Sequence, residues 1–214
     1  QSGRDSHHNP SHQEEQDGYG DQREINPDIL KIVTDFSGAE TPTQALHALG
    51  IAHILVSASE LRSEARAFIW DNFSPLEIRA DAWQDPHIDP ECRIHMYIAG
   101  FPCQPFSKLG RQQGLLDEKG RGTAAEVCIH RIHTLKPDNF ILENVANSKV
   151  VHNGKFWDTL TSQLREEGYT LDDCILDAQH YGTPQTRLRV YLVGRRGTHP
   201  PIQFAKPKGN MDIE

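Results

Sequence analysis

Short apolar segments alternate with amphipathic segments from residue 29 to residue 193, and this alternation limits the possible folds more than any other feature. Segments typical of strands lie at residues 29–36, 51–57, 95–99, 140–142, 171–176 and 188–193. Segments with helical periodicity lie at residues 41–49, 61–73, 121–135 and 156–167. Strands and helices that alternate at this spacing form parallel sheets, because each helix carries the chain back to the start of the next strand. The sequence therefore predicts an α/β domain, a mostly parallel sheet with helices on both faces.

The first 24 residues differ from the rest of the chain. They contain almost no aliphatic side chains, and their two basic and six acidic residues give a net charge of −4. A segment that buries no apolar surface cannot offset the entropy lost on ordering, so we expect a disordered polar tail at residues 1–24. His7, His8 and His12 could bind a metal, but their spacing matches no ligand pattern, which favours a solvated leader and predicts no metal site.

Composition excludes some classes of protein. No run of 18 apolar residues is present, so we expect no membrane span. The formal net charge of −8 argues against a protein that holds nucleic acid by basic charge alone. Cys92, Cys103, Cys128 and Cys174 show no Cys-x-x-Cys spacing, which favours a reducing, intracellular compartment: the nucleus in a eukaryote or the cytoplasm in a bacterium.

One cysteine lies where chemistry is expected. Ligands of parallel sheets bind at the carboxyl ends of the strands, and Cys103 follows the strand that ends at Ala99. Pro102 and Pro105 fix the backbone on both sides of Cys103, so that its sulfur has a defined direction. A free thiol is only roughly 3% ionised at pH 7, so a nucleophilic role needs nearby amides or a cation. A lone cysteine is more often a buried structural residue, and the surrounding string Gly-Phe-Pro-Cys-Gln-Pro-Phe-Ser decides against that alternative.

This string resembles the catalytic loop of the DNA (cytosine-5) methyltransferases, and the resemblance extends in order along most of residues 31–196. The other matching motifs are Phe36-Ser37-Gly38, Glu60, Asp81, Gly114…Asp117…Arg121-Gly122-Thr123, Glu143-Asn144-Val145 and Gln185-x-Arg187-x-Arg189. The family has a Rossmann-like, S-adenosylmethionine-dependent methyltransferase fold. The resemblance therefore implies a catalytic domain at residues 25–196, with residues 197–214 as a linker towards a target recognition domain.

The resemblance implies a site for S-adenosylmethionine. The cofactor-binding residues that it implies are Phe36, Ser37, Gly38, Glu60, Leu61, Asp81, Ala82 and Pro102. Glu60 is expected to accept hydrogen bonds from the ribose hydroxyls, as acids at this position do in dinucleotide folds. Asp81 is expected to accept from the adenine amino group, and Ala82 to supply its backbone N–H. The alternative for both acids is surface charge at a strand end.

The implied reaction adds the Cys103 thiolate to C6 of cytosine, which makes C5 nucleophilic towards a methyl group. Glu143 can assist at N3 only in its protonated form, which burial behind the strand would favour. Arg187 and Arg189 lie two residues apart, so both project from one face of a strand, where one can donate to cytosine O2 and the other to a loop or phosphate. The alternatives are an ion pair or helix cap for Glu143 and edge-strand salt bridges for the arginines.

The implied substrate is DNA with a flipped-out cytosine, because C5 is inaccessible within a stacked duplex. The polar segment 107–119 carries Lys108, Arg111 and Lys119, which could close over the flipped base and contact phosphates. An ordinary solvated loop is the alternative. The residues from Arg187 onward carry a net charge of +4, which suggests that a DNA-facing surface begins there.

The sequence departs from the family pattern in two ways. After Phe36-Ser37-Gly38 the chain continues as Ala39-Glu40-Thr41, where the family has a small residue and two glycines. Glu40 therefore brings a negative charge near the expected position of the methionine carboxylate. The alternatives are that Glu40 points outward, or that it lies at the positive end of a helix. The chain also contains no segment that resembles the recognition domain. We therefore expect the catalytic part of a longer protein. Two other functions are open: a transfer RNA cytosine-5 methyltransferase, and an inactive relative that serves as a binding module.

Overall fold

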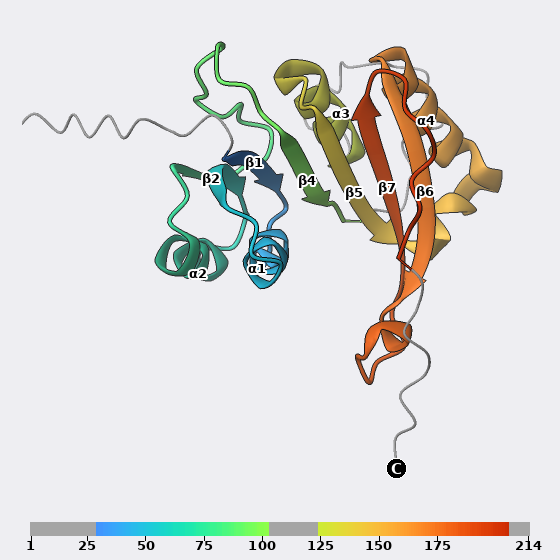
Figure 1. Cartoon of the computed structure of the whole chain (residues 1–214), viewed down its shortest axis with the longest axis horizontal. Helices are drawn as coiled ribbons and strands as arrows, with labels where there is room; N and C mark the ends of the chain where they lie inside the picture. The colour runs from blue at the N-terminus through green and yellow to red at the C-terminus, as the bar shows by residue number, and fades with distance from the viewer. Residues whose placement is uncertain (1–28, 103–123, 206–214) are drawn as a thin grey trace, which may run out of the picture.

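The computed structural model describes residues 29–102 and 124–205, which build one seven-stranded sheet (Figure 1). The order of the strands is β3-β2-β1-β4-β5-β7-β6. Their bounds are β1 Leu30–Asp35, β2 His53–Ser59, β3 Glu77–Arg79, β4 Met96–Gly100, β5 Asn139–Val145, β6 Tyr169–Asp177 and β7 Leu188–Arg196.

The five strands from β3 to β5 run parallel, and β7 lies antiparallel between β5 and β6. The predicted mostly parallel sheet is confirmed. The short strand β3 was not expected, and β2 ends two residues later than predicted, at Ser59, so that Glu60 follows it directly.

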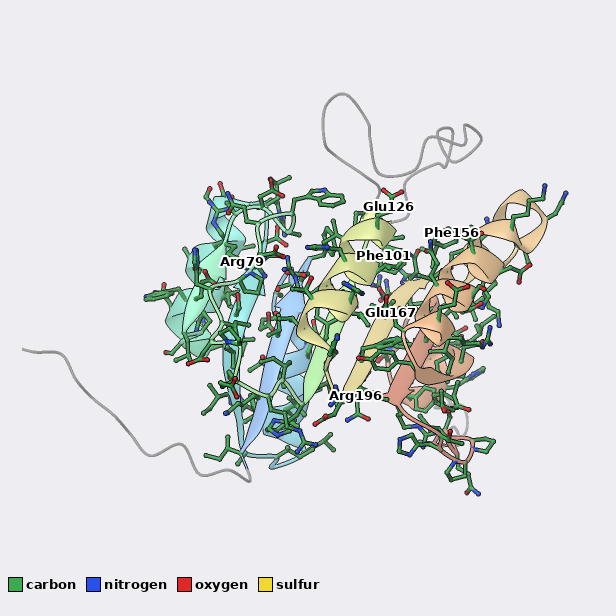
Figure 2. The ribbon with its side chains drawn as sticks, turned by 90° about the horizontal axis from the view of Figure 1, so that it is seen from above. Arg79, Phe101, Glu126, Phe156, Glu167 and Arg196 are labelled. Atoms are coloured by element: carbon green, nitrogen blue, oxygen red, sulfur yellow. The ribbon has the colours of Figure 1, made fainter. Side chains whose placement is uncertain are left out.

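Helices cover both faces of the sheet, as predicted. Their bounds are α1 Thr41–Ala48, α2 Ser63–Phe73, α3 Ala124–Leu135 and α4 Lys155–Glu166, with short 3-10 helices η1 Ala146–Lys149, η2 Val151–Gly154 and η3 Ala178–Tyr181. Helices α3 and α4 pack against each other over β4, β5 and β7 (Figure 2). Helices α1 and α2 contribute Leu46 and Ile69 to a smaller core on the other face. Within the described ranges no helix is long and apolar enough to span a membrane.

Local sequence explains the main elements. Pro42 lies in the first turn of α1, where its missing N–H removes no helical hydrogen bond. In α4 the buried residues Phe156, Leu160 and Leu164 are four apart and form one apolar stripe. Buried and partly exposed side chains alternate along β5. Phe140 and Leu142 face α3 and α4, and the residues between them face the other side of the sheet.

The direction of β7 determines which loops meet at the edge of the sheet where the parallel strands end, which we call the functional edge. The carboxyl ends of β1, β2, β4 and β5 lie at the lower edge of the sheet in Figure 1. Because β7 is antiparallel to β5, its first residues lie at this same edge, opposite the end of β5. Loops from both halves of the sheet therefore converge on one edge, where ligands of parallel sheets bind.

Candidate active site

The cofactor loop, residues 36–40, begins directly after β1 and has an unusual backbone. Phe36, Gly38 and Glu40 all have positive φ angles, of 56°, 56° and 55°. Of these only glycine adopts such a conformation without a steric cost. No atom lies within 4 Å of the position that a Cβ would take at Gly38, so the space beside its backbone is open. The loop is thus tightly turned and leaves room next to Gly38.

Glu60 contacts this loop. Its Oε2 accepts a hydrogen bond of 2.9 Å from the Gly38 N–H, and its Oε1 accepts one of 3.0 Å from the Arg62 N–H. The Ser37 N–H donates to the Ser59 carbonyl at 3.0 Å, which ties the ends of β1 and β2 together. Leu61, beside Glu60, is 82% exposed. The structure therefore brings Ser37, Gly38 and Glu60 together, as the sequence motifs implied.

Asp81 and Ala82 lie in the loop after β3, which we call the adenine loop, residues 81–85. The Asp81 Oδ1 accepts from the Trp83 N–H at 2.9 Å, which makes Asp81 the first residue of a turn. Asp81 is exposed, and Ala82 is half-buried. Both residues are accessible at the functional edge.

Glu40 takes one of the two positions considered for it: it is the N-cap of α1, at the positive end of the helix. Its side chain does not point outward: it is completely buried, and its carboxylate oxygens accept hydrogen bonds of 2.9 Å from Thr34 and Thr43. Burial raises the pKa of Glu40, and the hydroxyl hydrogen bonds oppose this only in part. The charge that seemed to conflict with a cofactor carboxylate is therefore enclosed and weakened.

The predicted nucleophile, Cys103, lies outside the described residues, as do the motif from Gly114 to Thr123, the segment 107–119 and the N-terminal tail. The chain that leads into the Cys103 segment is described. Phe101 is buried and Pro102 is exposed, just after β4. The Asn144 side chain donates to the Phe101 carbonyl at 3.1 Å and is itself buried. Asn144 thus holds the entrance to this segment, a role that the motif match alone did not indicate.

Glu143 lies at the carboxyl end of β5 and forms an ion pair with Arg189 of β7, at 2.8 Å between Oε1 and Nε. Both side chains are partly exposed, by 26% and 22%. The burial expected for Glu143 is therefore only partial, and the arginine pairing considered as an alternative is present. Gly100 lies opposite Glu143 in the neighbouring strand, and a Cβ at Gly100 would approach the Glu143 Oε2 to 3.3 Å. A glycine at this position gives the carboxylate its space.

Arg187 lies just before β7, not within it. Its N–H donates to the Asp177 Oδ1 at 2.9 Å, so the buried Asp177 fixes the turn that carries the arginine. Tyr191 faces the same group of charges: its pKa is raised by burial and by Glu143, while Arg187 and Arg189 lower it. Arg189 thus pairs directly with Glu143, whereas Arg187 lies in the turn before β7. Tyr191 was missed, although its two-residue spacing from Arg189 places it on the same face.

Of the described cysteines, Cys128 has the least reactive environment. It is completely buried, and burial raises the pKa of its thiol far above the usual value. Cys92 and Cys174 are half-buried, and burial also raises the pKa of Cys174. The thiols of Cys128 and Cys174 therefore lack the lowered pKa of an activated nucleophile.

Solved structures share this fold. A DNMT2 mutant of Spodoptera frugiperda superposes with a TM-score of 0.66 at 20% identity and covers 85% of this chain and 57% of that one. The methyltransferase EhMeth of Entamoeba histolytica gives a TM-score of 0.58 at 17% identity, with 85% and 58% covered. At such low identities the similarity shows the fold alone, a Rossmann-like methyltransferase sheet.

Sequence comparison gives the family. The type II methyltransferase M.HgiCI of Herpetosiphon aurantiacus is 33% identical over 188 residues, which are 86% of this chain and 43% of that protein. M.MspI of a Moraxella species is 30% identical over 182 residues, or 83% and 41% of the two chains. The chain thus spans less than half the length of these two bacterial relatives. The family model of the C-5 cytosine-specific DNA methylases matches residues 30–213. The chain belongs to the C-5 cytosine-specific DNA methylase family.

Proposed function

We propose that this chain is the catalytic part of an enzyme that transfers a methyl group from S-adenosylmethionine to C5 of cytosine in DNA. The observation that carries the proposal is the pairing of Glu143 with Arg189 at the functional edge, 2.8 Å apart. N3 and O2 are adjacent on one edge of cytosine, so two adjacent side chains of this kind can contact both atoms. Asn144, the next residue of β5, binds the segment that leads to Cys103.

In the proposed reaction the Cys103 sulfur forms a bond to C6, and the electron pair of the C5–C6 double bond shifts towards N3. Glu143 donates a proton at N3, and a guanidinium of Arg187 or Arg189 stabilises the charge that develops at O2. These steps leave C5 electron-rich. C5 would then bond the methyl group that the cofactor supplies, and the electron pair of the broken carbon–sulfur bond would leave with the cofactor. Removal of the C5 proton by water or another base then lets the sulfur–C6 bond break, which restores the C5–C6 double bond and returns the thiolate to Cys103 and the N3 proton to Glu143.

The described residues fit S-adenosylmethionine. The donors of its adenosine part are ribose hydroxyls and an amino group, and the chain presents the matching acceptors, Glu60 and Asp81, after adjacent strands. The open space beside Gly38 allows the ligand to approach the backbone. Phe36, Ser37, Leu61, Ala82 and Pro102 complete the proposed site. The cofactor, when bound, supplies an electrophilic methyl group.

The proposed partner is DNA whose target cytosine is flipped out of the duplex. The bacterial relatives are more than twice as long as the part that matches this chain. We therefore propose that recognition of the target sequence depends on a part of the protein beyond this chain, and that segment 107–119 contacts phosphates near the flipped base.

A covalent trap tests the proposal. The chain, and in parallel the full-length protein that contains it, is incubated with S-adenosylmethionine and duplex DNA carrying 5-fluorocytosine. Fluorine cannot leave C5 as a proton does, so a competent enzyme stays attached through Cys103. We expect an adduct that resists denaturation, is lost in Cys103→Ser and is retained in Cys92→Ser, because Cys92 precedes β4 whereas the proposed site follows this strand.

The same trap separates the alternatives. An adduct with 5-fluorocytosine RNA and none with DNA would replace the proposal with an RNA methyltransferase. If neither nucleic acid forms an adduct with the full-length protein, and calorimetry detects no S-adenosylmethionine binding, the chain is an inactive binding module.

A further inference from the structure

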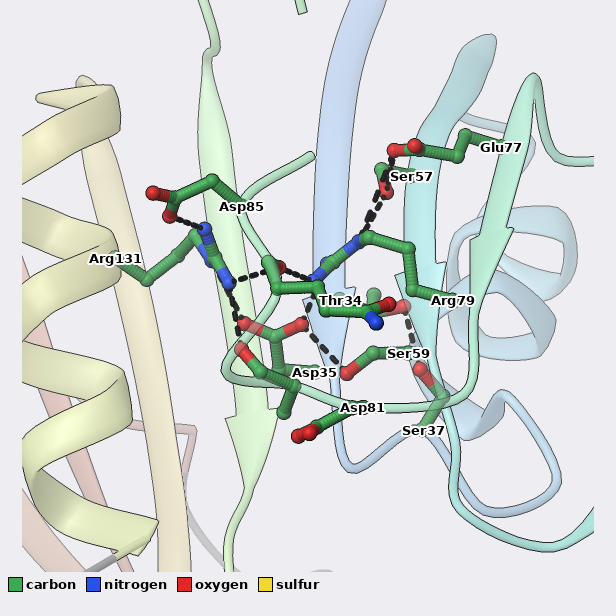
Figure 3. A network of polar contacts seen from close by, with 12 residues as sticks. Thr34, Asp35, Ser37, Ser57, Ser59, Glu77, Arg79, Asp81, Asp85 and Arg131 are labelled. Atoms are coloured by element: carbon green, nitrogen blue, oxygen red, sulfur yellow. Dashed lines mark hydrogen bonds and ion pairs between the residues drawn. The ribbon is translucent and has the colours of Figure 1, made fainter. Parts of the chain in front are cut away.

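Asp35, the last residue of β1, is the centre of a buried polar network directly before the cofactor loop (Figure 3). Its Oδ1 accepts hydrogen bonds from Ser59 at 2.6 Å and from Arg79 at 2.8 Å. Its Oδ2 accepts from Tyr97 and from Arg131, both at 3.1 Å. All five side chains are almost completely buried. Two guanidinium groups thus share one carboxylate at the end of β1.

Both arginines continue past Asp35 to the adenine loop. The Arg131 Nη2 donates to the Ala82 carbonyl at 2.7 Å and to the Gln84 carbonyl at 2.9 Å. The Arg79 Nη1 donates to the same Gln84 carbonyl. The Arg131 Nη1 also donates to the Asp85 Oδ1, at 2.5 Å. The fork of each guanidinium therefore connects the end of β1 with the backbone of an exposed loop.

The two buried guanidinium groups need several hydrogen-bond acceptors. A buried guanidinium without partners is costly, so each N–H of the two arginines needs an acceptor. Asp35 supplies only two oxygens and also accepts from Ser59 and Tyr97. Ser57 accepts from the Arg79 Nε, and Asp85 accepts from the Arg131 Nη1. The carbonyls of Ala82 and Gln84 are the other acceptors, and these charge-assisted hydrogen bonds are stronger than neutral ones. The hydrogen bonds that the two buried guanidinium groups require therefore also hold the backbone of the adenine loop.

We infer that Arg131 and Arg79, oriented by Asp35, are positioning residues for adenine recognition: they hold the adenine loop in the conformation that presents Asp81 and Ala82 to the base. The inference rests on the proposed function, since it requires that the chain binds S-adenosylmethionine. Arg131 comes from α3 and Arg79 from β3, so the loop is fixed from two sides. Neither arginine contacts the ligand in this role. They act through the loop.

The test is discrimination between adenine and hypoxanthine. Calorimetry compares S-adenosylhomocysteine with S-inosylhomocysteine, which lacks the 6-amino group that Asp81 is proposed to bind. We expect the wild-type protein to prefer the adenine ligand by a factor of about 10 to 100, as a hydrogen bond to a charged group does. Arg131→Lys keeps the charge but loses the fork, and we expect this preference to fall by about tenfold.

Two further variants keep the test decisive. Asp85→Asn alters the outer contact of Arg131 at a side chain that is 55% exposed, so the variant keeps its fold, and we expect the preference to fall by about twofold to threefold. Arg195→Lys alters a matched arginine–aspartate pair at the far edge of the sheet, with Asp172, and leaves the preference unchanged. Melting temperatures are measured for all variants.

The outcomes separate the inference from the proposed function. If the wild-type protein binds neither ligand, the proposed cofactor is wrong and the inference fails with it. If the wild-type protein binds both equally, or if Arg131→Lys and Asp85→Asn weaken both ligands by the same factor, the cofactor site stands and the positioning role is overturned. A merely structural role gives that equal weakening.

Discussion

Around β1, Asp35 and Arg131 are completely buried, whereas on β5 and β7 the paired Glu143 and Arg189 keep 26% and 22% of their side chains exposed. The buried pair belongs to a closed network in which each carboxylate oxygen has several donors. The exposed pair is a single contact at an open edge. In a buried network one arrangement dominates, because any broken bond leaves a charge without a partner. A partly exposed pair can separate at low cost, because water replaces the lost partner.

The two halves of the sheet therefore differ in rigidity. The half from β3 to β4 holds a fixed shape that is suited to a constant ligand. In the half from β5 to β7 the ion pair can open, so that each charged group can contact the proposed substrate instead of its partner. Substitutions in the first half should therefore change stability, and those in the second half should change turnover.

The largest effect is expected for Asp35→Asn. The change leaves Arg79 and Arg131 buried with a neutral partner, and breaking a buried ion pair in this way costs about 3–5 kcal/mol of unfolding free energy. Urea unfolding measures it. A loss below about 1 kcal/mol would show that the network is not closed and would remove the contrast between the halves.

Glu143→Gln should change turnover and not stability. The amide cannot donate a proton at N3 as a carboxylic acid does, so kcat should fall by about 100-fold or more, the usual contribution of general acid catalysis. The affinity for S-adenosylhomocysteine and the melting temperature should stay near the wild-type values. Asp172→Asn, at the pair with Arg195, is the matched control and should leave kcat unchanged. Equal losses in both variants would contradict the assignment.

Gly100→Ala sharpens the same point with one methyl group. The new Cβ would lie 3.3 Å from the Glu143 Oε2, so the carboxylate has to shift by a few tenths of an ångström. Misplacement of a catalytic group lowers the rate, and we expect kcat to fall by about tenfold. Stability should change little, because alanine is tolerated in a strand. An unchanged kcat would show that Glu143 needs no defined position.

The smallest effect is expected for Glu40→Gln, and it depends on pH. Because burial raises the pKa of Glu40 in the folded state, the unfolded chain loses its proton first as the pH rises above 4.5. Wild-type stability therefore falls relative to the variant as the pH rises from 4.5 to the raised pKa of the folded state, on the order of 1 kcal/mol or less. Urea unfolding at several pH values measures this difference.

Glu77→Gln supplies a control of opposite sign. Burial alone would raise the pKa of Glu77, but hydrogen bonds from His87 and Ser57 lower it. Glu77 therefore adds stability above the unfolded pKa, and this contribution is lost as the pH falls through the folded pKa. Equal pH profiles for the two variants would show that neither carboxyl is coupled to folding.

The sequence predicted the mostly parallel sheet and its helices, because these follow from periodicity. Short motifs indicated Gly38 and Glu60 as members of one site, and the hydrogen bond between them is a finding of the structure. The Asp35 network was not predictable in the same way: its partners lie 44 and 96 residues away along the chain. One signal was present. Arg131 lies on the apolar face of α3, between the buried Cys128 and Ile132, where a charge requires a buried partner.

Other differences also have physical causes. Strand β3 has three residues, too few for a recognisable alternation. The partial exposure of Glu143 depends on the face of β5 that it shares with Arg189, and a sequence does not show which face of a strand a helix covers. The role of Cys103 remains a prediction of the motif, because Cys103 lies outside the described residues.

The segment after β7, residues 197–205, returns along β6. Thr170 donates to the Gly197 carbonyl at one end of β6, and Tyr181 donates to the Ala205 carbonyl just beyond the other end. The chain thus runs back along the sheet and reaches the edge where Glu143 and Arg187 lie (Figure 1). A module tethered at this edge would have a high effective concentration at the site, so it could act there with weak contacts of its own.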